Sequence, residues 1–171
     1  AISYCMRKIS GSYVVIFMLD GILYAFRDPL GIKPLCLGKT ETGGHVLASE
    51  SVALDAIGAE FVRDICPGES VRLQGGEVFS RKMMKAKSCA HCMFEYVYFA
   101  RADAVIDGVS VYDVRRKTGA LLAKEAPANA DLISPVPDSG TAAATGFSRE
   151  SGIPFREALI KNRYTGRTFI M

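Results

Sequence analysis

The sequence predicts a mixed α/β chain, with antiparallel sheet in its first half and a parallel sheet with helices in its second half. Short apolar runs separated by glycine- and proline-containing turns fill residues 11–80, as in antiparallel sheets. Between residues 130 and 160 a strand, a helix and a second strand follow one another with short connections, which favours a right-handed crossover. The 171 residues are 49% hydrophobic and 23% charged, so a sizeable core can form.

The first predicted element is a hairpin. Residues 13–19 and 22–26 are apolar, and the Asp20-Gly21 pair that joins them favours a tight turn between two strands. Residues 27–35 then form a charged turn, in which a proline and a glycine favour the bend. Composition alone predicts a solvated polar turn with local ion pairs.

The next part of the sequence is predicted to contain short strands around one helix. Residues 45–49 form an apolar strand, and Ser49 or Ser51 can cap a helix over residues 54–57 that Gly58 ends. The remaining strands of this half are expected at 61–63, 70–73 and 77–79, before a basic linker at 81–87.

A run of apolar and aromatic residues crosses positions 92–103. Such a run is typical of a buried strand or of a tightly packed segment between two domains. The run also contains Glu95, Arg101 and Asp103, whose charges need partners. We therefore interpret it as the junction between the two halves of the chain.

After the junction the pattern becomes helical. Ser110 and Asp113 are predicted to begin a helix that ends before Pro127. Val111, Val114, Leu121 and Leu122 are expected near one face of that helix. The later elements are a buried strand at 130–136, a tight loop at 137–140, a helix at 141–151 ended by Gly152, and a strand at 153–160.

Two polar segments of the second half are candidate anion sites. Residues 137–141 lie between a strand and the start of a helix, where backbone N–H groups favour anions. The competing interpretation is a Ser or Thr that simply caps the helix. Residues 161–168 carry three cations around a glycine and could close over a polyanion, or form a solvated basic loop.

Charge and cysteine content exclude several classes of function. The net charge of +3 is too small for a general nucleic-acid or membrane-surface binder, so neither partner is expected. Without a membrane span or a signal peptide, a cytoplasmic location is expected. The five cysteines favour reduced thiols, and Cys89, His91 and Cys92 supply only half of a zinc site.

Taken together, these motifs resemble the glutamine phosphoribosylpyrophosphate amidotransferases, over about residues 11–171. The segments 27–35 (RDPLGIKPL) and 48–50 (ASE) resemble the later part of their amino-terminal-nucleophile (Ntn) glutaminase domain, and asparagine synthetase shares them. Three further segments resemble the linker and the first half of a type I phosphoribosyltransferase domain, namely 92–107, 136–139 and 161–170.

This resemblance implies a fold, an activity and partners. Residues 1–85 would be the C-terminal part of the glutaminase domain, and residues 86–171 the N-terminal part of the phosphoribosyltransferase domain. The family converts phosphoribosyl pyrophosphate (PRPP) and glutamine to 5-phosphoribosylamine, glutamate and pyrophosphate, the first committed step of de novo purine synthesis. Purine nucleotide inhibitors and a homo-oligomer are expected. The family uses an amino-terminal cysteine as its nucleophile, whereas this chain begins with Ala1, so we expect an internal fragment that is inactive alone.

The resemblance also implies roles for single residues. Ser139 would help to hold Mg²⁺ and pyrophosphate, and Cys92 matches a ligand of the [4Fe–4S] cluster that one branch of the family contains. Another branch keeps this cysteine without a cluster. Phe94 and Tyr98 would couple the two domains. The start of a flexible loop that closes over PRPP would comprise Lys161, Tyr164 and Arg167.

Two alternatives stay open at this stage. A phosphoribosyltransferase-like regulatory module would bind PRPP without catalysis. An asparagine-synthetase-type glutaminase would have a nucleotide-binding domain after residue 85, which the run at 92–103 does not favour.

Overall fold

The computed structural model describes residues 1–85 and 88–166, and the chain forms two compact units. The first unit covers residues 1–110, and the second begins at Val111. Both contain helices together with paired β segments, so the predicted mixed α/β class is confirmed. The division into glutaminase and transferase domains at residue 85 stays a prediction. Within the described residues, no helix is both long enough and apolar enough to cross a membrane.

The first unit contains a four-stranded antiparallel sheet in the order β1-β2-β6-β7. The predicted hairpin is confirmed, because Leu19 pairs with Ile22 across Asp20 and Gly21. Both turn residues have positive φ, 51° and 73°, as a type I′ turn requires. The strands are β1 (Val14–Leu19), β2 (Ile22–Arg27), β6 (Glu69–Gln74) and β7 (Glu77–Lys82). The last strand extends into the basic segment predicted as a linker, of which residues 86–87 lie outside the described residues.

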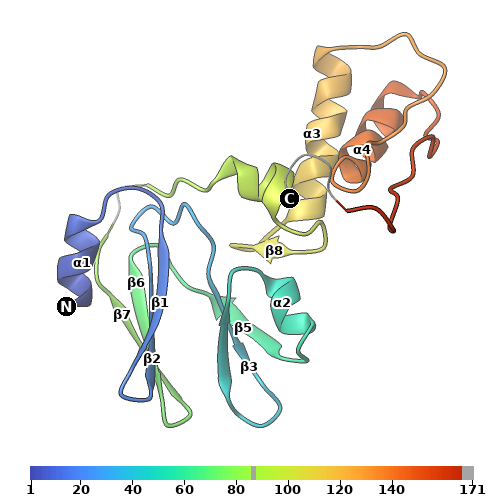
Figure 1. The fold of residues 1–171 in the computed structure, drawn as a ribbon. Coiled ribbons are helices and arrows are strands. Elements are labelled where there is room, and N and C mark those ends of the chain that lie inside the picture. Colours follow the sequence, from blue (N-terminus) through green and yellow to red (C-terminus); the bar gives the residue numbers. More distant parts are fainter. Residues whose placement is uncertain (86–87, 167–171) are drawn as a thin grey trace. The chain divides into compact units, whose positions relative to one another are not determined.

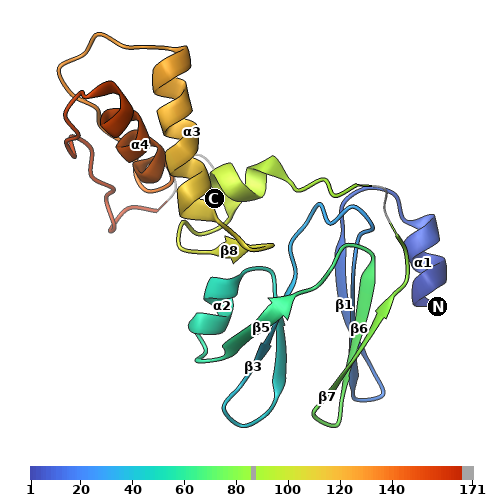
Figure 2. The ribbon, with the colours of Figure 1, turned by 180° about the vertical axis from the view of Figure 1, so that it is seen from behind.

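A three-stranded sheet in the order β4-β3-β5 lies beside the first sheet (Figures 1 and 2). Its strands β3 (Cys36–Lys39), β4 (His45–Ala48) and β5 (Glu60–Asp64) include two of the predicted ones. Residues from both sheets form one apolar core, which contains Ala25, Leu35, Leu37, Ile65, Val71 and Leu73. A short helix, α1 (Ile2–Lys8), was not among the predicted elements.

A helix follows β4 as predicted, but it ends at Asp55 instead of residue 57, and the predicted cap is wrong. The helix α2 (Ser51–Asp55) has Glu50 as its N-cap, without a side-chain capping bond. Ser51 does not cap the helix because its hydroxyl accepts a hydrogen bond from the Val105 N–H at 3.0 Å. The start of α2 is therefore bonded to a segment about 50 residues further along the chain.

The run at 92–103 does not form the predicted buried strand. It contains a π-helical turn, η1 (Glu95–Phe99). A short hairpin follows, whose strands β8 (Val105–Ile106) and β9 (Val109–Ser110) have two residues each. Successive side chains of a helical turn point in different directions, so consecutive aromatic residues cannot all face a core. Phe94, Tyr98 and Phe99 are each about 60% exposed.

The second unit is built on two packed helices, α3 (Val111–Glu125) and α4 (Thr141–Ser151) (Figures 1 and 2). Both helices were predicted, and Gly152 ends α4 with a φ of 75°. The predicted face of α3 is confirmed at Val111 but wrong at Leu121 and Leu122, which are more than half exposed. The buried positions follow a four-residue spacing instead: Val111, Arg115, Gly119 and Ala123.

Small residues form this face because the two helices approach closely. A Cβ atom at Gly119 would lie 1.9 Å from the Ala143 carbonyl oxygen, and one at Gly146 would lie 1.9 Å from the Arg116 carbonyl oxygen. Neither position can accept a larger side chain without moving a helix.

The two strands predicted beside α4 are reduced to one parallel bridge between Ile133 and Phe155. The Ile133 N–H donates to the Pro154 carbonyl and the Arg156 N–H donates to the Ile133 carbonyl, each at 2.9 Å. The predicted parallel direction is confirmed. The predicted strand lengths are wrong for the described residues, in which Ile160 is 88% exposed and the chain after Phe155 pairs with no further strand.

Candidate functional site

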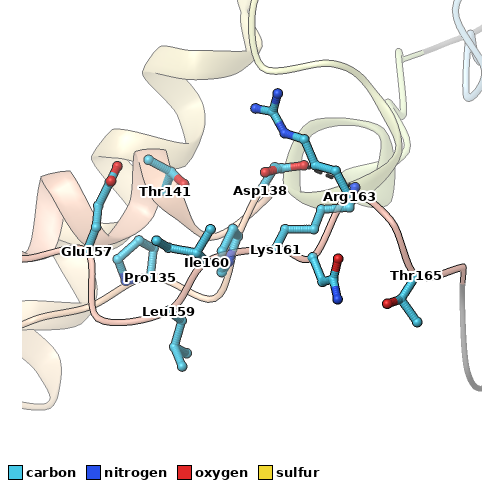
Figure 3. Close-up of a pocket in the computed structure, with 11 residues that line it drawn as sticks. Pro135, Asp138, Thr141, Glu157, Leu159, Ile160, Lys161, Arg163 and Thr165 are labelled. Carbon is cyan, nitrogen blue, oxygen red and sulfur yellow. Dashed lines mark hydrogen bonds and ion pairs between the residues drawn. The ribbon is translucent and has the colours of Figure 1, made fainter.

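A cavity of about 600 Å³ lies in the second unit, between the start of α4 and the segment that follows the bridge (Figure 3). Its polar lining combines two acids, Asp138 and Glu157, with two bases, Lys161 and Arg163. The rest of the lining comes from Pro135, Pro137, Thr141, Leu159, Ile160, Asn162 and Thr165. A lining with both charges suits a polyanion that arrives with a metal cation.

The turn at residues 137–140 leads directly into α4. Gly140 is the N-cap of the helix, so the interpretation of this turn as a plain Ser or Thr cap is wrong. A Cβ at Gly140 would lie 2.8 Å from the Val136 carbonyl oxygen, which explains why a glycine is needed here. The Thr141 N–H donates to the Asp138 carbonyl at 3.3 Å, and since Gly140 has no side chain to cap the helix, the N–H groups that follow in the first turn can face an anion.

One ion pair connects the two sides of the cavity. The Lys161 ammonium lies 3.3 Å from an Asp138 carboxylate oxygen, as Figure 3 shows. The side chains are 65% and 78% exposed, respectively. An exposed pair of this length contributes little to stability, so both groups can exchange partners at low cost.

The structure brings only part of the predicted anion site together. Lys161 lines the cavity, whereas Ser139 and Tyr164 are not among the lining residues, and Tyr164 is fully exposed. Arg167 lies outside the described residues. Arg163, one of the three cations of the predicted segment 161–168, also lines the cavity, whereas sequence reasoning missed Glu157.

In the first unit, the predicted coupling residues lie on the exposed side of η1. The rings of Phe94 and Tyr98 contact Phe99 with centroid distances of 6.2 and 5.5 Å. The Lys33 ammonium lies 4.9 Å from the centre of the same Phe99 ring and forms a 2.6 Å ion pair with Glu95. Coupling between the domains stays a prediction for both residues.

Cys92 lies at the start of this segment. Its N–H donates to the Ile32 carbonyl at 2.9 Å, and its Sγ is 4.0 Å from the Lys33 ammonium. Within residues 1–85 and 88–166, no group of three or more Cys, His, Asp or Glu side chains is arranged to hold a metal ion.

A second cysteine of the first unit, Cys36, is buried. Burial is the main cause that raises the pKa of its thiol to about 11, and repulsion from Asp64 adds to it, so this thiol is protonated.

The segment at 27–35 is not the solvated turn that composition predicts. Arg27 and Asp28 are both fully buried. The Asp28 carboxylate accepts hydrogen bonds from the N–H groups of Leu30 and Ile32, each at 2.9 Å, and so closes the turn on itself. The prediction of a solvated turn failed because it considered only ion pairs between residues that are neighbours in the sequence.

Solved structures give the first comparison. The structure described as the allosteric regulatory enzyme of purine biosynthesis matches with a TM-score of 0.89 and 37% identity, and covers 99% of this chain. Glutamine PRPP amidotransferase from B. subtilis, complexed with ADP and GMP, matches with a TM-score of 0.90 and 36% identity over the same share. The chain therefore has the mixed α/β fold of a part of these purine-biosynthesis enzymes.

Curated relatives give the second comparison. Amidophosphoribosyltransferase from Archaeoglobus fulgidus is 50% identical over 96% of this chain, and that from Methanothermobacter thermautotrophicus is 52% identical over 98%. The chain is thus homologous to the amidophosphoribosyltransferases over nearly its whole length. It spans 36% of the length of each of these two relatives. No protein-family profile matches the chain.

Proposed function

We propose that this chain is part of an amidophosphoribosyltransferase, which converts PRPP and glutamine to 5-phosphoribosylamine, glutamate and pyrophosphate. Identity of about one half to amidophosphoribosyltransferases, across nearly the whole chain, carries this proposal. Residues 1–85 would belong to the glutaminase half, and residues 86–171, which include the whole second unit, to the phosphoribosyltransferase half. Purine nucleotides would inhibit the enzyme, which is proposed to be a cytoplasmic homo-oligomer.

The cavity of the second unit is proposed as part of the PRPP site. Lys161 and Arg163 would contact the phosphate groups, and the N–H groups at the start of α4 would face the pyrophosphate. Tyr164 and Arg167 are proposed to act with Lys161 when the loop closes over the substrate.

Mg²⁺ is proposed to bind beside the same turn. The hydroxyl of Ser139 and the carboxylate of Asp138 are hard oxygen donors, which Mg²⁺ accepts together with phosphate oxygens of a substrate. The ion would neutralise charge on the departing pyrophosphate. Asp138 would then leave Lys161 free to contact the substrate.

Cys92 is proposed as one ligand of a [4Fe–4S] cluster. Such a cluster needs four thiolates, and the described residues do not assemble the other three around Cys92. The cluster is therefore assigned no part in the proposed reaction.

The complete gene product provides the test. With PRPP, Mg²⁺ and glutamine, we expect equal amounts of pyrophosphate and glutamate to be released. Binding of PRPP without release of pyrophosphate would instead indicate a regulatory module and would contradict the proposal. Lys161→Met should weaken PRPP binding roughly tenfold or more, because a cation beside the phosphates is lost. Lys117→Met, an exposed change on α3, is the matched control and should have no effect.

A further inference from the structure

The buried Arg27 guanidinium is the most densely bonded side chain of the first unit for which bonds are described. Its side chain is only 1% exposed. It donates to the carbonyl oxygens of Lys33, Ile65 and Gly31 at 2.7, 2.7 and 2.9 Å. The two terminal nitrogens also donate to the two carboxylate oxygens of Asp107, each at 2.7 Å. This bidentate pair joins positions that are 80 residues apart in sequence.

Asp107 is held in a defined position by its own turn. Asp107 and Gly108 connect β8 to β9 with φ angles of 49° and 75°, which is a second Asp-Gly turn of the type I′ form. Their N–H groups donate to the carboxylate of Asp64. His91 Nδ1 lies 3.0 Å from the Asp107 carboxylate. The carboxylate that meets Arg27 is thus fixed from several sides.

Other bonds join the same two regions. The N–H groups of Ala90 and Cys92 donate to carbonyls of the turn that follows Arg27, and Lys33 of that turn pairs with Glu95. Nearer the hairpin, the Arg101 N–H donates to the Glu50 carboxylate at 2.9 Å. Residues 88–110 therefore lie against residues 1–85 of the same unit along most of their length.

We propose that Arg27 and Asp107 are positioning residues that fix residues 88–110 against residues 1–85 of the first unit. The other described bonds of this segment to residues 1–85 are single bonds or involve partly exposed side chains, whereas this pair is bidentate and its guanidinium is fully buried. Removal of one partner leaves the other charge buried without compensation, which is much more costly than the loss of an exposed pair.

A functional consequence follows, and it rests on the proposed function. In the proposed reaction, ammonia released from glutamine in the glutaminase half must reach the transferase half. A loosened segment would impair this transfer, while each half keeps its own chemistry. Glutamine-dependent synthesis of phosphoribosylamine should then fall, while synthesis from added ammonia is retained. A residue that contributes only to stability would lower both activities together.

The test uses Asp107→Asn in the complete gene product, because Asn tolerates the positive φ of the turn but removes the charge. Asp103→Asn is the matched control, since Asp103 forms a 2.8 Å ion pair with Arg101 in the same segment and is 58% exposed. Hydrogen–deuterium exchange and the two synthetic activities are measured for both variants.

We expect exchange in residues 88–110 to become roughly tenfold to 100-fold faster in Asp107→Asn, with β2 and β6 unchanged. We also expect a selective loss of the glutamine-dependent activity. Unchanged exchange in 88–110, equal acceleration over the whole first unit, or an equal effect of Asp103→Asn would overturn the proposal. If the unmodified protein makes no phosphoribosylamine, the proposed function fails, and the exchange experiment still tests the positioning role.

Discussion

The pairs Arg27–Asp107 and Lys161–Asp138 are both cation–aspartate contacts, but they have opposite surroundings. The first is bidentate at 2.7 Å, with side chains 1% and 16% exposed. The second has a single 3.3 Å contact between side chains that are mostly exposed. Charges withdrawn from water must keep their partners, whereas exposed charges can exchange them. The first pair therefore suits a permanent structural role, and the second suits a site that binds and releases an anion.

The largest expected effect is that of Arg27→Met. It removes the cation from Asp107 and three buried carbonyls, and should lower the free energy of unfolding of the first unit by about 3–5 kcal/mol. Chemical denaturation of the complete gene product measures this change. A loss below about 1 kcal/mol would remove the distinction between the two pairs.

The second unit should instead be most sensitive at its helix crossing. Gly119→Ala places a methyl group 1.9 Å from the Ala143 carbonyl oxygen, so α3 and α4 must separate. We expect a destabilisation of about 1–3 kcal/mol, which thermal or chemical unfolding of the second unit would detect. Lys117→Ala on the same helix is the control. If the two variants are equally stable, the helices do not pack as described.

The buried carboxylate of Glu69 should make the stability of the first unit depend on pH. Burial acts to raise the pKa of Glu69, but hydrogen bonds from Arg63, Ser80 and the Cys66 N–H more than offset this and hold the pKa below its ordinary value of 4.5. The ionised Glu69 carboxylate therefore contributes its full stabilisation of the fold above pH 4.5. This contribution is lost as the pH falls through the lowered pKa of Glu69. Glu69→Gln should cost about 1–3 kcal/mol at pH 7 and flatten the acid dependence of unfolding. Parallel pH curves for the variant and the unmodified protein would contradict this.

The smallest effect on stability is expected for Lys161→Met. Loss of an exposed pair should change the free energy of unfolding by less than about 0.5 kcal/mol, although PRPP binding weakens. Calorimetric titration and unfolding of the same sample separate the two effects. A destabilisation as large as that of Arg27→Met would show that the second pair is structural as well.

Local sequence signals predicted the elements that depend on neighbouring residues. Asp20-Gly21 gave the first hairpin correctly, and Asp107-Gly108 has the same chemistry, but its strands of two residues are too short to show alternation. The helices α3 and α4 were found from their periodicity and their ends.

Long-range partners explain the main failures. The partner of Arg27 is 80 residues away, so its turn was predicted as solvated although it is buried. The buried face of α3 was missed because a close helix crossing selects glycine and alanine rather than leucine. The cavity lining was predicted only in part, since the fold and not sequence spacing brings Glu157 to the same cavity as Asp138.

Double-mutant cycles on the two pairs, each at low and at high salt, test the central claim most directly. Arg27→Gln with Asp107→Asn should give a coupling energy of about 2 kcal/mol or more that salt hardly changes. Lys161→Gln with Asp138→Asn should give less than about 0.5 kcal/mol, and 1 M salt should abolish it. Similar coupling energies with the same salt dependence for both pairs would contradict the claim that one is permanent and the other exchangeable.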